Sequence, residues 1–266
     1  MNFRIISALV LRYIFLYTRT PMRLVELVFW PMVDLLIWGY TMTFIQGHVT
    51  GDFGVYLRFL VGSIILWDVV FRAQQGVAVS FLEDVWTRNL LNVFVAPVRT
   101  SEYLTATFAV GLMRIGVTTV IMSLVAMILY SFNIFQVGWA LIPFVVNLLL
   151  TGWSLGMIST ALILRWGQSV ESLAWAIPFF IQPFSAVFYE VSSMKPAWVQ
   201  NFALAMPSTH VFEGMRQVIK GNGFSTSHFF WALGENIIFM AIAGGIFMAM
   251  LNATKKRGLL TKFATQ

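Results

Sequence analysis

The sequence predicts an all-α polytopic membrane protein that forms one transmembrane domain over residues 1–266. Apolar residues make up 59% of the chain and charged residues only 11%, whereas a soluble domain is about half apolar and a quarter charged. The mean hydropathy of +0.80 points the same way. Six apolar stretches also reach the roughly 20 residues that a helix needs to cross a bilayer. These observations favour six membrane spans over any soluble fold.

Residues 1–23 are expected to form a basic amphipathic helix that lies on the membrane surface. On a helical wheel, the four arginines of this segment fall on one side of an otherwise apolar helix. Such a stripe suits the anionic headgroups of a cytoplasmic leaflet. A frayed basic terminus is the alternative. The four residues are Arg4, Arg12, Arg19 and Arg23.

The predicted spans follow in chain order. They are residues 24–46, 55–80, 102–131, 137–164, 170–189 and 229–252, with a tail at 253–266. The fifth span contains Pro178 and Pro183, and an interrupted helix is tolerated where it is buried in protein or lines a cavity. The fourth contains Gly152-Trp-Ser-Leu-Gly156, a GxxxG pattern that permits close helix contact, either within the chain or at a dimer seam.

Residues 81–101, between spans two and three, are predicted to form a short amphipathic helix at the membrane surface. Apolar residues recur there at three- and four-residue intervals, and two acids are expected in its first turn, where the helix dipole favours anions. The segment is too short and too charged to span a bilayer, so it is a candidate docking surface for a soluble partner. The candidate contact residues are Glu83, Asp84, Trp86, Arg88, Leu90, Leu91 and Phe94.

The connection at 190–228 is long and relatively polar, and it is predicted to hold two short helices that dip back into the membrane. Two prolines mark the expected helix starts. On the second helix Glu213 and Arg216 are three residues apart and are expected to pair, closing the outer mouth. The candidate outer gate comprises Pro196, Trp198, Pro207, Glu213 and Arg216.

The distribution of lysine and arginine predicts the orientation, because positive residues accumulate in cytoplasmic connections. If the N-terminus is cytoplasmic, the outer side holds only Arg58, Lys195, Arg216 and Lys220. The inner side then holds Arg4, Arg12, Arg19, Arg23, Arg88, Arg99, Arg165, Lys255, Lys256, Arg257 and Lys262. Both termini and the 81–101 helix are therefore expected to be cytoplasmic.

Four charged residues lie inside predicted spans, at a similar depth. They are Asp34, Asp68, Arg72 and Arg114. Two acids and two bases sum to zero, which predicts mutual pairing. Asp68 and Arg72 can pair directly because they are four residues apart on one helix. A charge inside the membrane is costly and marks function. A structural or gating network is favoured here over a substrate site, which remains the alternative.

The sequence lacks the motifs of the common enzyme classes. There is no GxxxxGK[ST] loop for ATP, and GxGxxG, HExxH and GxSxG are also absent. The chain has no cysteine, and His48, His210 and His228 are not at ligand spacing. We therefore expect no catalytic, cofactor-binding or metal-binding residue. The net charge of +6 is explained by cytoplasmic connections and does not require nucleic acid as a partner.

Taken together, the segments resemble the membrane subunit of a type 2 ABC-transporter permease over essentially the whole chain. A basic interfacial helix precedes span one, and an acidic-led helix running into Ala96-Pro97-Val98 joins spans two and three. Lys195-Pro-Ala-Trp-Val-Gln200 and the stretch from Met206-Pro207 to Arg216 are similar to the family's LPxWxQ and NPxxxxxxxxR region. The chain departs from that pattern at Lys195 and at Met206.

The resemblance implies a function and two partners. Two such subunits, in a homodimer, form an export pathway through the plasma (inner) membrane. Each binds a separate ATPase, which holds ATP and Mg²⁺, through the helix between spans two and three. Family cargoes include drugs, polysaccharides and lipid-linked glycans, and a small amphipathic or lipid-like cargo is preferred here. A polysaccharide or glycolipid exporter, an ion-coupled secondary transporter and a non-transporting scaffold remain the alternatives.

Overall fold

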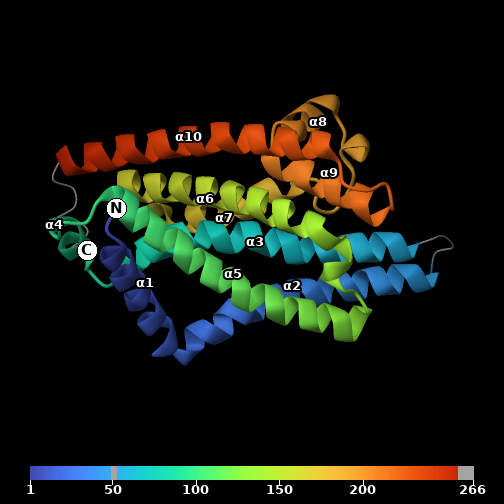
Figure 1. Ribbon diagram of the computed structural model, residues 1–266, viewed down its shortest axis with the longest axis horizontal. Coiled ribbons are helices and arrows are strands. Elements are labelled where there is room, and N and C mark those ends of the chain that lie inside the picture. The colour runs from blue at the N-terminus through green and yellow to red at the C-terminus, as the bar shows by residue number, and fades with distance from the viewer. Residues whose placement is uncertain (49–52, 257–266) are drawn as a thin grey trace.

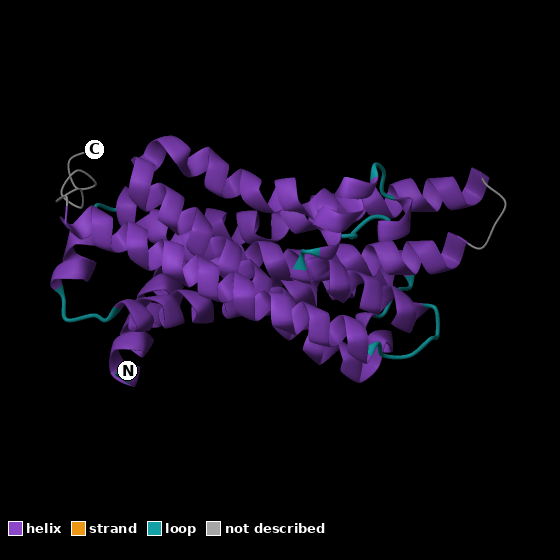
Figure 2. Cartoon of the chain, turned by 90° about the horizontal axis from the view of Figure 1, so that it is seen from above, coloured by secondary structure: helices purple, strands orange, loops and turns teal. Residues whose placement is uncertain are grey.

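The computed structural model describes residues 1–48 and 53–256, and every regular element in those ranges is helical. This confirms the all-α prediction for the described residues. Figure 2 shows helices that run along one long axis and are joined by short connections. The α-helices are α1 (Phe3–Thr18), α2 (Pro21–His48), α3 (Phe53–Trp86), α4 (Leu90–Val95), α5 (Thr100–Tyr130), α6 (Leu141–Trp166), α7 (Glu171–Ile181), α8 (Ala197–Leu204), α9 (Pro207–Ile219) and α10 (Thr226–Lys256).

Helix α3 is the axis of the bundle. Five helices of the described chain are long and apolar enough to cross a membrane, namely α2, α3, α5, α6 and α10. In α3, 67% of the most apolar stretch is buried, against 17% in α2 and 22% in α10. Helices α2, α5, α6, α7 and α9 all pack against α3. A helix that is apolar on every side and also buried on every side belongs at the centre of a bundle.

The two ends of the bundle differ. At one end, on the left of Figure 1, lie the start of α1, helix α4 and the last turn of α10. At the opposite end lie α8, α9 and the start of α10. We refer to them as the α4 end and the α8 end. The start of α1 and the end of α10 therefore lie at the same end of the bundle.

The expected fifth span, 170–189, is not a continuous spanning helix, so six such helices are not found in the described chain. Helix α7 has only 11 residues and is followed by the 3₁₀ turn η3 (Gln182–Phe184) and by irregular backbone. Pro183 lacks an N–H for a helical ladder, which accounts for the break. The segment nevertheless runs alongside α3 in space, because Glu171 contacts Trp86 and Phe179 contacts Phe71.

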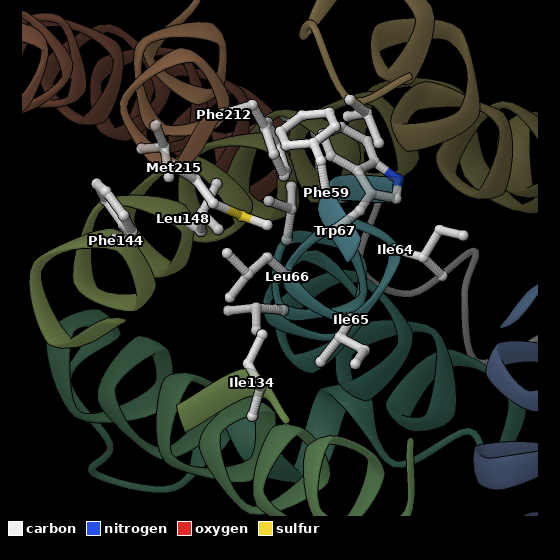
Figure 3. Packing of buried hydrophobic residues seen from close by; sticks show 14 of the residues in the cluster. Phe59, Ile64, Ile65, Leu66, Trp67, Ile134, Phe144, Leu148, Phe212 and Met215 are labelled. Atoms are coloured by element: carbon white, nitrogen blue, oxygen red, sulfur yellow. The ribbon is translucent and has the colours of Figure 1, made fainter. Parts of the chain in front are cut away.

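The core of the bundle lies between α3, α6 and α9. Figure 3 shows Phe59, Leu66 and Trp67 of α3 packed with Leu148 of α6 and Phe212 of α9. The 3₁₀ segment η1 (Ile134–Ala140) adds Ile134 and Val137 at its edge. A second apolar cluster joins the later halves of α3, α6 and α10 toward the α4 end. Together these clusters bind α6 and α10 to one side of α3.

The GxxxG pattern is used within the chain. A Cβ atom on Gly152 would lie 2.5 Å from the Cβ of Ala73 and from the carbonyl oxygen of Val70. One on Gly156 would lie 2.7 Å from the Cβ of Val77. The two glycines thus let α6 lie directly against α3, the kind of close approach that small residues permit. Of the two interpretations left open by the sequence, the structure supports packing within the subunit.

The first two helices meet at a turn within the predicted interfacial segment. Helix α1 ends at Thr18, and α2 begins at Pro21, three residues earlier than the predicted start of span one. Proline is favoured in a first helical turn because its missing N–H has no partner there anyway. The buried face of α1, formed by Ile6, Leu9 and Tyr13, packs against α5.

Two short helices occupy the connection at 190–228, as predicted. Pro196 is the N-cap residue of α8, and Pro207 is the first residue of α9. Helix α9 is well buried and packs against α3, α6 and α10, whereas α8 leaves Trp198 65% exposed. Whether the pair dips into a membrane stays a prediction.

Candidate functional site

Seven polar side chains gather at the α4 end, where α1 and the start of α2 meet the end of α3 and the start of α5. We call this group the α4-end cluster. It joins elements that are far apart in the sequence, and its two acids are almost completely buried. Its members are Arg12, Tyr13, Tyr17, Arg23, Glu83, Asp84 and Tyr103.

Asp84 is the centre of the cluster and is fully buried. One carboxylate oxygen, Oδ1, accepts a hydrogen bond from Arg12, and the two residues form an ion pair. The other accepts hydrogen bonds from Tyr13 at 2.8 Å and from Tyr103 at 2.9 Å. Burial, reinforced by Asp84, raises the pKa of Tyr13 well above its usual value, so its hydroxyl remains a donor at neutral pH. A carboxylate with three such donors is fixed in place.

Glu83 makes a parallel set of contacts one residue earlier. It accepts from Arg23 Nη1 at 2.8 Å and from the Tyr17 hydroxyl at 3.2 Å. Burial raises the pKa of Tyr17 to about 12, an effect that the charge of Arg114 opposes. Tyr17 is therefore neutral at pH 7. Glu83 and Asp84 thus tie α1 and α2 to the last turn of α3 through ion pairs whose carboxylates are buried and whose arginines are partly exposed. Removing either arginine would leave a buried carboxylate without its partner, which is destabilising.

The predicted position of the two acids was wrong. They do not begin a short surface helix, because α3 continues through them to Trp86. Nothing between residues 81 and 86 interrupts a helix, and the break comes only at Arg88, whose φ is 54°. With side chains exposed by 2% or less, Glu83 and Asp84 face the interior of this chain and offer no surface to a soluble partner.

Among the predicted contact residues, those that the structure leaves exposed at this end lie at Trp86 and beyond it, toward helix α4. Trp86 is 41% exposed, and its indole N–H donates to Glu171 Oε2 at 3.1 Å. Arg88 is exposed in the turn before α4, and Val95 in α4 is 82% exposed. Leu90, Leu91 and Phe94 belong to α4 by their backbone, and their side chains lie outside the described part of the structure.

Of the four charges expected inside the membrane, two pair as predicted. Arg72 Nε donates to Asp68 Oδ1 at 3.1 Å, and both side chains are buried. The expectation that all four pair mutually was wrong. In the described part of the chain neither Asp34 nor Arg114 takes part in an ion pair. Arg114 lies 4.5 Å above the ring of Tyr17, and Asp34, which is half-buried, lies on α2.

Gln75 connects these buried charges. Its side-chain oxygen accepts from Arg72 Nη1 at 2.7 Å, and its backbone oxygen accepts from Arg114 Nη1 at 3.3 Å. Because Tyr17 touches both Arg114 and Glu83, polar contacts run without interruption from the α4-end cluster to Asp68. Sequence reasoning missed Gln75 and all three tyrosines. The sequence did contain one signal for the tyrosines: Tyr13 and Tyr17 are one helical turn apart, next to Arg12, so they lie on one face of the helix.

A second charged group, which we call the α8-end cluster, holds the expected gate residues Glu213 and Arg216 and adds Glu190 and Lys220. The predicted pair is confirmed, with Arg216 Nη1 at 2.8 Å from Glu213 Oε1. Arg216 is buried, donates to the Ala186 carbonyl at 3.1 Å and lies 4.0 Å above the ring of Phe59. It thereby locks α9 onto the irregular backbone that follows α7.

Within this cluster, Lys220 Nζ lies 2.6 Å from Glu190 Oε1. The hydrogen bond from Lys220 lowers the pKa of Glu190, partial burial opposes that change, and the charges of Lys220 and Arg216 add to the lowering. Glu190 is thus ionised at neutral pH. His210 and His228, which are distant in sequence, also meet at the α8 end, with their Nδ1 atoms 3.2 Å apart. Sequence spacing gave no sign of that contact.

The described chain is thus a bundle of membrane-length helices with charged side chains buried along its axis and helix α1 fastened across one end, which are the features of a polytopic membrane protein. Residues 4–220 match the family model described as "ABC-2 type transporter", and the chain belongs to that family. It is the membrane subunit of an ABC transporter, and the family implies a separate ATPase subunit as its partner.

Curated relatives agree. The chain is 20% identical over 191 residues to the "Inner membrane transport permease YadH" of Escherichia coli K12. The match covers 70% of this chain and 72% of the relative. The protein of the same name from Shigella flexneri matches at the same identity and coverage.

Proposed function

We propose that this chain is the membrane subunit of an ATP-driven exporter that acts as a homodimer in the inner membrane. The chain itself binds no cofactor, since ATP and Mg²⁺ belong to the ATPase subunit. Its cargo, a small amphipathic or lipid-like molecule, moves outward. The relatives' name, an inner membrane transport permease, supports the location and specifies no cargo.

The observation that carries this proposal is the fastening of α3 at the α4 end. Helix α4 follows the end of α3 after a turn of three residues, and the α4-end cluster fixes that end of α3 to α1 and α5. A force applied to α4 by a closing ATPase would therefore move α1, α3 and α5 together. A ligand can shift a conformational equilibrium only through different affinities for the two states, and ATP binding to the ATPase subunit would supply that difference.

We assign the α4 end to the cytoplasm. Among described residues, the lysines and arginines at the ends of helices favour this side, since Arg4, Arg19, Arg99, Arg165 and Lys256 all belong to it. The outward direction of transport is part of this proposal and follows the family resemblance. At the α8 end Arg216 holds α9 in place, so the α8-end cluster would act as the outer gate.

Two other functions predict different findings. An ion-coupled secondary transporter would need no ATPase, so the exposed α4 would have no ATPase subunit to bind. A polysaccharide or glycolipid exporter would share every feature above and differ only in cargo. Within the described residues, the largely helical α8 end holds no added carbohydrate-binding domain, which favours the smaller cargo.

Co-purification tests the proposal. We expect a tagged chain, extracted in mild detergent, to retain an ABC-type ATPase in a 1:1 ratio, identified by mass spectrometry. Val95→Asp, in exposed α4, should release that ATPase, whereas Trp198→Ala, at the exposed α8 end, should not. Failure to recover any ATPase, or loss with both variants alike, would overturn the assignment.

A further inference from the structure

Two buried guanidinium groups lie on either side of Gln75, in the middle of the bundle. Arg72 on α3 is 4% exposed and Arg114 on α5 is 5% exposed. Arg72 donates to the side-chain oxygen of Gln75, and Arg114 donates to its backbone oxygen. The two cations are therefore held near one another by a shared neighbour, although like charges repel.

These two arginines leave three buried donors unused. In the described structure, Arg72 Nη2, Arg114 Nε and Arg114 Nη2 have no hydrogen-bond partner. Buried polar groups are almost always paired, and a buried donor without a partner loses the full desolvation free energy. Two acceptors of the same region, Asp68 Oδ2 and Glu83 Oε2, are also open, but they form no hydrogen bond with these donors. The three donors on two cations therefore still lack an acceptor.

The open donors suit a negatively charged acceptor. Three acids of this region are paired, as Arg12–Asp84, Arg23–Glu83 and Arg72–Asp68, and Asp34 on α2 forms no ion pair in the described chain. Arg114 forms no described ion pair either, since it acts on Glu83 only through its charge, and its guanidinium lies over the ring of Tyr17. Its donors are therefore available to an acceptor that comes within hydrogen-bond distance.

We propose that Arg72 and Arg114 form a binding site for a phosphate-type oxyanion, either inorganic phosphate or the phosphate headgroup of an anionic amphiphile. Guanidinium forks fit the oxygens of such a group by paired hydrogen bonds, which a spherical ion cannot accept in the same way. The site deepens the proposed function: if the chain exports an amphipathic cargo, this is where the charged group of that cargo binds.

Helix α1 controls access to the site. The ring of Tyr17 covers the Arg114 guanidinium at 4.5 Å, and Tyr17 in turn is held by Glu83. On the side away from the bundle, α1 exposes Leu11 and Phe15, as a helix lying in a leaflet would. A shift of α1 would therefore open the arginines toward the leaflet in which α1 lies.

Thermal unfolding of the purified chain in a neutral detergent tests the site without an ATPase or a transport assay. Sodium phosphate is compared with sodium chloride at equal ionic strength, and micelles containing phosphatidylglycerol are compared with micelles containing phosphatidylcholine. A ligand that binds only the folded state at about a hundredfold excess over its Kd should raise Tm by roughly 5–10 °C. A gain with phosphate identifies the free ion, and a gain with phosphatidylglycerol alone identifies the headgroup.

Two variants localise the effect. Arg114→Gln should abolish the gain, and its melting without ligand serves as the reference for that variant. Arg19→Gln, at an exposed arginine just after α1, should keep the gain and so exclude general attraction to anions. If Arg114→Gln does not fold, Arg114→Lys replaces it: this variant keeps the charge, loses the fork and should show a reduced gain.

Three results would overturn the site: no gain with either phosphate source, an equal gain with chloride, or an undiminished gain in the Arg114 variant. Water bridging Arg114 to Glu83 is the competing explanation and predicts the first of these. Because no ATPase enters the measurement, its failure would leave the proposed function standing.

Discussion

At the scale of residues, ion pairs divide into those that one helix makes by itself and those that need the whole fold. Asp68–Arg72 and Glu213–Arg216 are separated by four and three residues, and their positions in the sequence were sufficient to predict them. Arg12 and Asp84 are 72 residues apart. Their pairing depends on how α1 lies against α3, which local pattern does not specify. The most important contacts of the candidate site therefore could not be predicted.

The pair formed by Asp68 and Arg72 gives a first prediction. Arg72→Ala leaves a buried carboxylate without its partner, and breaking a buried pair costs roughly 3–5 kcal/mol. Replacing both residues by alanine should cost less than Arg72→Ala alone. Melting in detergent measures both, with the exposed Arg19→Ala as a control. A double variant no more stable than the single one would mean that Arg72 is balanced chiefly by a group other than Asp68.

A second prediction concerns pH. The pKa of Glu190 is lowered in the fold, so its contribution to stability is present above the unfolded pKa and disappears as pH falls through the folded value. Because Glu190 is partly exposed, the effect at pH 7 should be about 1 kcal/mol or less. The difference in Tm between the unmodified chain and Glu190→Gln should shrink toward zero as the buffer is acidified. Glu26→Gln, an exposed acid, should show no comparable trend.

At the scale of elements, apolar length predicted the five spanning helices to within a few residues at every end except that of α3, because crossing a bilayer requires that length. Helix α3 runs on to Trp86, whereas span two was predicted to end at residue 80. The helix predictions failed where a segment is long and apolar enough for a span but also contains prolines or charged residues. Pro178 and Pro183 were recognised as breaks, yet the apolar content of 170–189 still led to a full span being predicted there. Conversely, charge at Glu83 predicted the end of a span, while the helix continued because burial and ion pairs stabilise it there.

Close contact between α3 and α6 gives a third prediction. Gly152→Ala would place a Cβ 2.5 Å from Ala73 Cβ, so the helices must separate, and overpacking of this kind costs typically 1–3 kcal/mol. Gly116→Ala in α5 meets nothing within 4 Å and should be neutral or stabilising, since alanine favours helix. Melting curves of the two variants should move in opposite directions. Equal behaviour would show that α6 does not rely on this contact.

The membrane position of α8 can be tested by chemical labelling, since the chain contains no cysteine. Helix α8 exposes Trp198 and Phe202, and we expect these apolar side chains to lie in lipid. Trp198→Cys and Phe202→Cys should react slowly with a membrane-impermeant thiol reagent added outside cells. Asn222→Cys, in the exposed polar turn after α9, should react quickly. Equal rates would place α8 in water and remove the basis for a re-entrant segment.

At the scale of the whole molecule, the bundle is asymmetric along its axis. The α4 end holds the buried ion pairs and the exposed helix α4, and the α8 end is closed around Arg216. Composition was sufficient to predict a membrane protein, and the order of the segments with a few short motifs carried the family resemblance. It could not show that α3 connects both ends, which only the packing of the helices around α3 reveals.

The most direct test is whether nucleotide, acting at the α4 end, changes the α8 end. The complex with the ATPase is placed in lipid nanodiscs, and labelling of Met194→Cys, a buried position at the α8 end, is timed with and without a non-hydrolysable ATP analogue. We predict that nucleotide changes the labelling rate several-fold and that Val95→Asp in α4 abolishes this change. A rate that is the same with and without nucleotide in the intact complex would contradict coupling between the two ends.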